Sequence, residues 1–150
     1  MHQFLHFAPR VCDLFVDTHL YNAHTVAAEI LQGGLPILTR PGETMASRVA
    51  SSLLKSLSLE DELVATSHND YVERAIHLYV NRDRLRQIHE GILQQVESKD
   101  LPLFNPKLFA RNFISGLKQA WNKFRKKQKT EHILVGVSSA DRTPSSHTEL

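Results

Sequence analysis

The sequence predicts an α/β domain built on parallel strands. Two short apolar runs, Leu14–Thr18 and Pro36–Thr39, are bounded by turn-forming residues and have the composition of strands buried on both faces. A helix-length segment lies between them and stops at Gly33-Gly34, because glycine tolerates the left-handed conformation that ends many helices. Two strands joined through a helix pair in parallel with a right-handed crossover.

The intervening segment has a helix start and an apolar side. Asn22 or Thr25 can cap its first turn through a side-chain oxygen. Its apolar side is formed by Ala27, Ala28, Ile30 and Leu31.

A second helix is predicted after Pro41-Gly42-Glu43. Its apolar residues recur at every fourth position, which predicts one face packed on the sheet: Met45, Val49, Leu53 and Leu57. Glu62–Ala65 is predicted to be a third short strand, so that strands and helices alternate as in α/β domains.

The rest of the chain is predicted to be helical. Asn69 and Asp83 can each cap a helix, and Asn105 followed by Pro106 predicts the start of a long amphipathic one. The aromatic residues of that last helix are expected in the core: Phe109, Phe113, Trp121 and Phe124. Residues 128–150 lack a sustained apolar period and are expected to be a mostly disordered tail.

Length and composition limit the possibilities. A chain of 150 residues with 41% apolar residues can form one domain with a substantial core. The net charge of +2 is too small to indicate a partner, so neither nucleic acid nor membrane is expected. The single Cys12 is expected to be buried in a protein of a reducing compartment. Without a membrane-spanning run or a signal peptide, a cytoplasmic location is expected.

Candidate ligand-binding residues follow the first strand. In open parallel sheets, ligands bind beyond the carboxyl ends of strands, where a helix N-terminus offers N–H groups to an anion. The backbone at His24, Thr25 and Val26 can therefore hold a phosphate, and Glu29 can accept the hydroxyls of a ribose. Spacing alone favours a simpler interpretation, in which Thr25 caps the helix and Glu29 is solvated or stabilises the helix dipole. No glycine-rich dinucleotide motif or Walker loop is present.

A long ungapped stretch then points to a family. The segment DLFVDTHLYNAHTVAAEILQGGLPILTRPGETMASRVASSLL, residues 13–54, resembles the donor-binding region of the O-GlcNAc transferase and SPINDLY-type glycosyltransferases of glycosyltransferase family 41. The Y-N-A-H-T and P-G-E-x-x-A-S-R-V blocks are the most specific parts. The resemblance extends more weakly to about Trp121.

This resemblance implies a GT-B enzyme with two facing Rossmann-like lobes. Such enzymes move N-acetylglucosamine, or fucose in some members, from a nucleotide sugar to Ser or Thr of proteins. Residues 1–127 would form the second half of the nucleotide-binding C-terminal lobe, a partial Rossmann-like parallel sheet followed by several helices. The donor substrate would be a UDP-sugar, and neither a metal nor a cofactor is expected.

His2 and His6, at helical spacing, are expected to be an exposed pair.

The resemblance also assigns roles to the candidate residues. His24, Thr25 and Val26 would lie at the diphosphate, and Glu29 would replace the ribose-binding Asp of the family. The loop beside the sugar would consist of Pro41, Gly42 and Glu43, with Arg48 anchoring its helix.

Two departures from the family pattern affect this interpretation. Val26 replaces the second Thr of H-T-T, which removes a hydroxyl but keeps the backbone N–H. Leu5 stands where the family has a base-stacking histidine, and His6 is one position out, so either the segment before Asp13 shifts register or the base loses its stacking partner. The acceptor lobe and its catalytic residues are expected to be missing, so catalytic residues are not assigned. The chain is expected to be inactive alone, or to depend on that N-terminal lobe or on a tetratricopeptide-repeat protein.

Two alternatives stay open. The first is a non-catalytic remnant or protein-interaction module that retains the fold, which Val26 and Leu5 favour. The second concerns the basic run Lys123–Lys129, where a solvated helix end is the default and contact with RNA or membrane a minor option.

Overall fold

The computed structural model describes residues 11–99 and 101–135. The chain divides into two compact units at the boundary between Asn105 and Pro106. Within the described residues, no helix is both long and apolar enough to cross a membrane.

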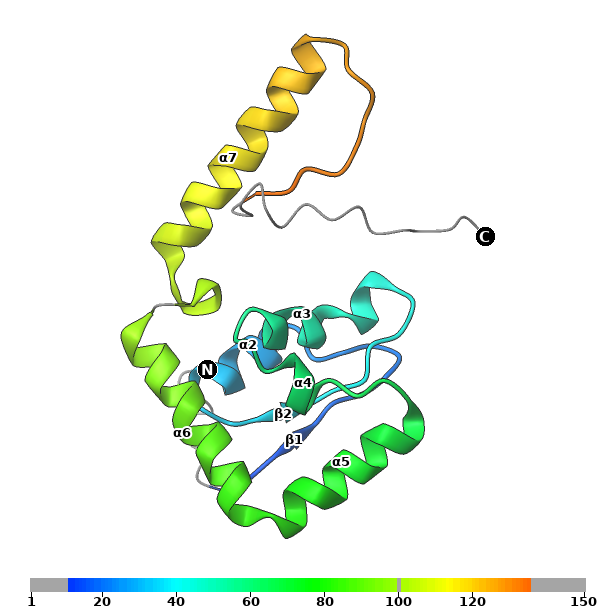
Figure 1. Ribbon diagram of the computed structural model, residues 1–150, viewed down its shortest axis with the longest axis vertical. Helices are drawn as coiled ribbons and strands as arrows, with labels where there is room; N and C mark the ends of the chain where they lie inside the picture. Colours follow the sequence, from blue (N-terminus) through cyan, green and yellow to red (C-terminus); the bar gives the residue numbers. More distant parts are fainter. Residues whose placement is uncertain (1–10, 100, 136–150) are drawn as a thin grey trace. The chain divides into compact units, whose positions relative to one another are not determined.

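The centre of the first unit is a parallel pair of strands. β1 (Phe15–Val16) pairs with β2 (Ile37–Leu38), and the helix α2 (Thr25–Gln32) connects them. Figure 1 shows α2 and α3 on one side of the strands and α5 on the other. The predicted α/β class and its strand, helix, strand crossover are confirmed. Burial of both strand faces was wrong for β1, since Val16 is 53% exposed.

The third predicted strand was wrong. Glu60–Leu63 forms the short helix α4, and only Val64 joins the sheet, through an isolated parallel bridge to Thr39. The first turn of α4 carries Glu60, Asp61 and Glu62. Negative side chains stabilise a helix N-terminus through the helix dipole, so this segment favours a helix over a strand.

The helix after the Pro-Gly-Glu turn is interrupted. Met45–Ser47 forms the 3-10 helix η1, and α3 runs from Val49–Lys55. Met45 is 80% exposed and does not belong to the predicted apolar face.

Several predicted helix caps were wrong. α2 has His24 at its N-cap with no capping side chain, and the buried Asn22 amide donates instead to Thr18 O at 2.8 Å. α5 (His68–Val80) is capped by Ser67 instead of Asn69.

The last helices begin at residues with clear signals. α6 (Arg82–Ser98) has Asn81 at its N-cap, so Asp83 lies in the first turn instead of capping it. After η2 (Pro102–Phe104), the helix α7 (Pro106–Arg125) begins at the predicted proline. Residues 128–135 form no helix or strand, whereas residues 136–150, His2, Leu5 and His6 lie outside the described residues.

The core of the first unit lies between the strands and the helices α2, α3 and α6. Its buried apolar residues come from every layer: Ala27, Ile30, Leu31, Leu35, Ile37, Leu54, Leu57, Leu63, Leu78, Leu85, Ile88 and Ile92. Five residues expected in the core are not buried, namely Cys12 and the four aromatic residues of α7. Cys12 is exposed, and α7 has no buried residue among those described.

Candidate functional site

Two loops meet at the carboxyl end of the parallel strands. The first, residues 17–24, follows β1, and the second, residues 39–48, follows β2. Asn22 N and His24 Nε2 donate to Ala46 O at 2.9 and 3.0 Å. Because a carbonyl can only accept, His24 carries its proton on Nε2. The two loops therefore form one continuous surface.

Asp17 organises the first loop. Its side chain is 6% exposed and accepts three hydrogen bonds, from Thr18 N at 2.9 Å, Ala23 N at 2.8 Å and the Thr39 hydroxyl at 2.8 Å. One carboxylate thus fixes both ends of the turn that leads into α2, and ties it to the end of β2. The sequence analysis did not predict that Asp17 holds this loop. The sequence does place an Asp at the carboxyl end of an apolar strand, directly before a turn, and that position could have indicated this role.

Tyr71 supports the same point from α5. Its hydroxyl donates to Asp17 O at 2.7 Å. Burial, followed by the nearby charge of Asp17, raises the pKa of the Tyr71 phenol. The neutral phenol is therefore the form that the folded protein favours.

The N-terminus of α2 opens onto this surface. α2 has no capping side chain and no acidic residue in its first turn. Thr25 is exposed and Val26 is 45% exposed, while Glu29 one turn later is half-buried. The first N–H groups of a helix lack partners within it and lie at the positive end of its dipole. This end of α2 is therefore suited to an anion.

The Pro-Gly-Glu loop is held by its own backbone. Gly42 N donates to Ser47 O at 3.0 Å, and Arg48 Nε donates to Gly42 O at 2.7 Å, so Arg48 anchors this loop. A Cβ on Gly42 would come within 2.6 Å of Ser47 Oγ, so a glycine is needed there. Pro41 and Gly42 are half-buried and Glu43 is exposed.

The sequence-predicted residues thus lie along one edge. His24, Thr25, Val26 and Glu29 belong to the start of α2, and the loop of Pro41, Gly42 and Glu43 is joined to them through Ala46. The His24 ring stacks on Tyr21, with 4.6 Å between centroids. That ring is therefore occupied by loop contacts, to Ala46 O and to the Tyr21 ring.

Two clefts lie away from this edge. One of about 310 Å³ is lined by Cys12, Asp13, Arg82, Leu85, Arg86 and His89. Another of about 580 Å³ lies beside α4, α5 and α6 and contains the ion pairs Arg74–Asp70 and Arg84–Glu62. Arg74, then the Thr66 backbone, holds the pKa of Asp70 down to about 2. Residues 11–99 and 101–135 contain no group of three or more His, Cys, Asp or Glu placed to bind a metal.

Comparisons with known proteins agree on one family. The sequence model of glycosyl transferase family 41 matches residues 7–113. The chain is 30% identical over 125 residues to a probable UDP-N-acetylglucosamine–peptide N-acetylglucosaminyltransferase, SEC, of Arabidopsis thaliana, and 33% identical over 124 residues to the corresponding enzyme of Caenorhabditis elegans. Each alignment covers 83% of the chain, but only 13% and 10% of those relatives.

A solved structure shows the same similarity. A mutant O-GlcNAc transferase of Thermobaculum terrenum superposes with a TM-score of 0.67 and 25% identity. The match covers 83% of this chain and 22% of that one.

Proposed function

The chain belongs to glycosyl transferase family 41, and from this premise we propose that its two joined loops form the donor half-site of a protein O-glycosyltransferase. The donor is a UDP-sugar, by analogy with the enzymes named for UDP-N-acetylglucosamine. The observation that carries this proposal is the N-terminus of α2, which is uncapped, free of acidic residues and partly exposed at the junction of the loops.

The diphosphate binds at the start of α2. The N–H groups of Thr25 and Val26, together with the Thr25 hydroxyl, donate to its oxygens. Val26 contributes only its backbone, since it lacks the hydroxyl of a second threonine. The site needs neither a metal nor a cofactor, because hydrogen-bond donors and the helix dipole meet the phosphate charge.

The ribose and the sugar lie on either side of the diphosphate. Glu29 lies one helical turn beyond Thr25 and is half-buried, and its carboxylate accepts from the ribose hydroxyls. Pro41, Gly42 and Glu43 border the sugar. The backbone of this loop is held by Ser47 and Arg48, which reduces the entropy that the loop loses on binding.

Transfer also requires an acceptor side. The chain spans about a tenth of the length of the two enzymes to which it was compared. We propose that the acceptor side is supplied by a further lobe of the family fold, or by a tetratricopeptide-repeat protein, in the cytoplasm. Catalysis depends on holding both substrates in register and on stabilising the leaving diphosphate.

A second candidate function is a non-catalytic interaction module that retains the fold. Val26 favours it, because this partly exposed position carries an apolar side chain where the family pattern has a hydroxyl. Such a module would bind no nucleotide at the start of α2.

Calorimetric titration with UDP and UDP-N-acetylglucosamine distinguishes the two. Val26→Thr restores one hydroxyl beside the phosphates, and since hydrogen bonds to charged groups contribute about 1.5–3 kcal/mol, the affinity should rise roughly tenfold or more. Val26→Ala is the matched control and should leave the affinity nearly unchanged.

The ribose contact has its own pair of variants. Glu29→Ala should weaken binding, whereas Gln32→Ala, at the exposed far end of the same helix, should not. A folded chain that binds neither ligand, as wild type or as Val26→Thr, contradicts the proposed function and favours the module.

A further inference from the structure

The stretch from residue 106 to residue 129 differs in charge from the rest of the chain. It holds eight of the 18 Lys and Arg residues and contains no Asp or Glu. The other ten basic residues share the rest of the chain with all 16 acidic ones. Because complementary charge selects partners, a protein that binds this stretch should be acidic, which the net charge of +2 for the whole chain conceals.

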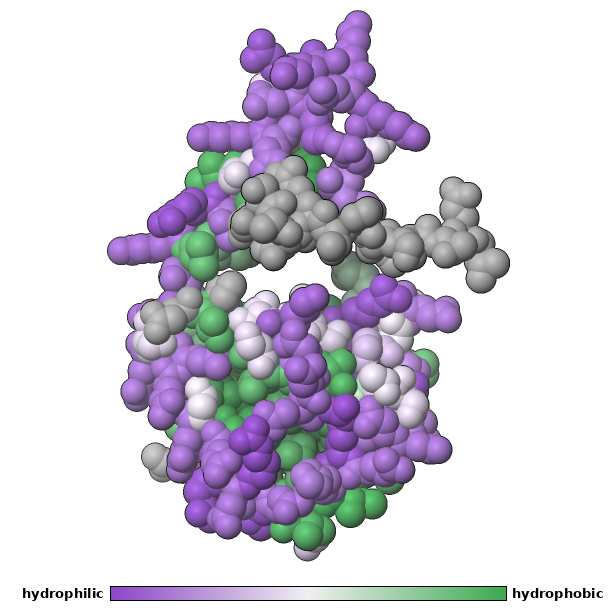
Figure 2. All heavy atoms as spheres, viewed as in Figure 1, coloured by the Kyte–Doolittle hydropathy of each residue, from purple (hydrophilic) through white to green (hydrophobic). Residues whose placement is uncertain are grey.

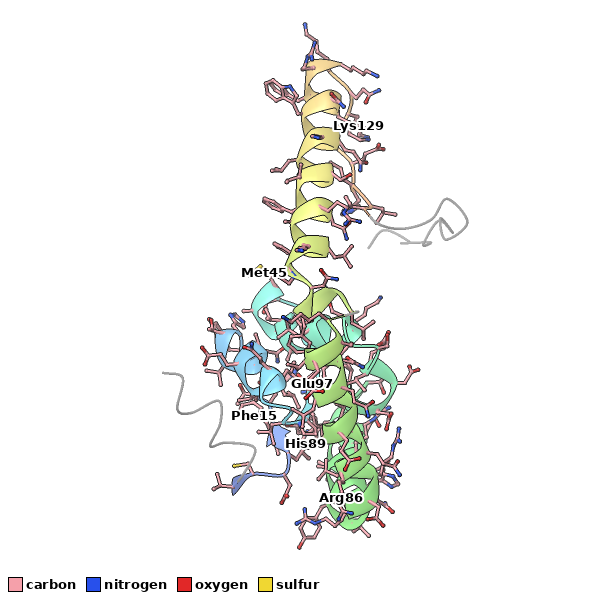
Figure 3. The ribbon with its side chains drawn as sticks, turned by 90° about the vertical axis from the view of Figure 1, so that its left-hand side faces the viewer. Phe15, Met45, Arg86, His89, Glu97 and Lys129 are labelled. Carbon is pink, nitrogen blue, oxygen red and sulfur yellow. The ribbon has the colours of Figure 1, made fainter. Side chains whose placement is uncertain are left out.

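The helix α7 occupies most of this stretch and exposes large apolar side chains. They include its aromatic residues: Phe109 66%, Phe113 57%, Ile114 51%, Leu117 56%, Trp121 59% and Phe124 73%. At 3.6 residues per turn they fall within an arc of roughly 140° along the whole helix. Figure 3 shows the side chains of α7 projecting outward along its length, and Figure 2 shows apolar residues at the surface of this unit. Anchors with this helical spacing are those with which an amphipathic helix fills an apolar groove.

The aromatic side chains form two pairs, one toward each end of the apolar arc. The ring centroids of Phe109 and Phe113 lie 6.0 Å apart, and those of Trp121 and Phe124 lie 5.7 Å apart. Each aromatic side chain can bury about 150–250 Å², more than the aliphatic ones between the pairs. The two pairs are therefore the expected anchors of this face in a complex.

The positive charge of α7 lies along one edge of the apolar arc. By the same helical geometry, that edge carries four basic side chains: Lys107, Arg111, Lys118 and Arg125. The side of the helix opposite the arc carries uncharged polar side chains: Asn112, Ser115, Gln119 and Asn122. A matching partner would present an apolar groove with an acidic rim.

The segment after α7 contacts the helix outside the apolar arc. Glu131 pairs with Lys123, and the Val135 side chain lies 3.4 Å from where a Cβ on Gly116 would be. By the helical geometry above, Lys123 and Gly116 lie beside the arc, on the edge away from the four basic side chains.

We propose that α7 binds in the helix-binding groove of an acidic calcium-sensor protein of the EF-hand class. Calcium opens that groove and exposes a floor of methionine side chains, which adapt to large aromatic anchors. The calcium-binding loops of such proteins are rich in Asp and Glu, so the proteins carry the negative charge that the basic edge of α7 requires. The proposal does not depend on nucleotide binding at the start of α2.

Other partners match this face less well. A bilayer surface presents its charge evenly on both sides of an embedded helix, whereas the basic edge of α7 lies on one side of the apolar arc. RNA would use the basic side chains, but Ile114 and Leu117 have no ring to stack on bases. A second copy of α7 would bring two strongly basic stretches together, which like charges oppose.

Titration of the full 150-residue chain with a tryptophan-free calmodulin tests the proposal. Trp121 is the only tryptophan of the chain, so a blue shift of its emission reports burial of this face. With calcium, the shift should saturate at one calmodulin per chain. Chelation of the calcium closes the groove and should abolish the shift. High salt should slow the association, because it screens the charges that steer the encounter.

Matched variants test the apolar arc. Phe113→Ala removes one aromatic anchor and should weaken binding about 30-fold or more, as the loss of a hot-spot residue does. Gln119→Ala, on the polar side of the same helix, is the control and should change the affinity less than about twofold.

A second pair of variants tests the basic edge. Lys118→Gln with Arg125→Gln should weaken binding about threefold for each charge, or roughly tenfold together, and should reduce its dependence on salt. The control is Lys55→Gln with Lys99→Gln, which removes the same charge from exposed lysines of the first unit and should leave binding unchanged.

Three results would overturn the proposal. The first is a calcium-loaded calmodulin that does not bind, including the case in which anionic vesicles or an RNA oligonucleotide bind instead. The second is binding that persists unchanged after calcium is chelated, or that Phe113→Ala leaves unchanged. The third is a chain that is dimeric by itself and that Phe113→Ala makes monomeric, because the apolar arc would then be covered by a second copy.

Discussion

Replacing Asp17 should loosen the loop that carries the start of α2. Asp17→Ala removes the acceptor for Thr18 N, Ala23 N and the Thr39 hydroxyl. Thr18 is exposed, so water can satisfy its N–H, but Thr39 is fully buried and Ala23 is half-buried. Each buried donor left without a partner costs about 1–3 kcal/mol, which gives a loss of about 2–6 kcal/mol in the free energy of unfolding.

Urea unfolding followed by far-ultraviolet circular dichroism measures this loss. Asp17→Asn keeps an oxygen that accepts from both N–H groups, and its amide can donate to the Thr39 hydroxyl. Its loss in the free energy of unfolding should therefore be about half that of Asp17→Ala. Asp13→Ala is the control: that carboxylate is 67% exposed in a surface ion pair with Arg82, and its loss should stay within about 0.5 kcal/mol. A loss below about 1 kcal/mol for Asp17→Ala, or equal losses for both Asp17 variants, would refute this reasoning.

Three further predictions concern stability. Gly34→Ala should lower the free energy of unfolding by about 1–3 kcal/mol, because φ is +88° and a Cβ would lie 2.7 Å from a leucine side chain. Gly91→Ala lies in open space within α6 and should raise the free energy of unfolding by about 0.5–1 kcal/mol, and thermal melts measure both changes. Arg74 lowers the pKa of Asp70 from 3.8 to about 2. The wild-type protein should therefore be more stable than Asp70→Asn at neutral pH, and this difference should shrink as the pH falls from 3.8 to about 2. Burial raises the pKa of Tyr71, so the stability difference between the wild-type protein and Tyr71→Phe should shrink as the pH rises above 10.0. A stability difference that stays constant with pH, for either residue, contradicts the pKa shift given for it.

Local sequence signals predicted the parts of the fold that depend on neighbouring residues. The strand, helix, strand crossover was predicted from two apolar runs and a glycine stop, and the start of α7 from Pro106. The wrong strand at Glu62–Ala65 shows the limit of such signals, because the same apolar residues fit a short helix when three acidic residues precede them.

Other features depend on contacts between distant residues. The bond from Tyr71 to Asp17 spans 54 positions, and no local pattern pairs those residues. The periodicity of α7 predicted an apolar face correctly, but periodicity does not say whether such a face is covered. That is why the aromatic residues were expected in a core and are exposed instead.

The central claim is that a nucleotide diphosphate binds at the start of α2. A titration of the ¹⁵N-labelled chain with UDP, followed by amide chemical shifts, tests it residue by residue. The account predicts saturable shifts that are largest at the N–H groups of Thr25 and Val26 and extend to Gly42. Unchanged amides at these positions with UDP in excess, or shifts confined to other parts of the chain, would contradict it.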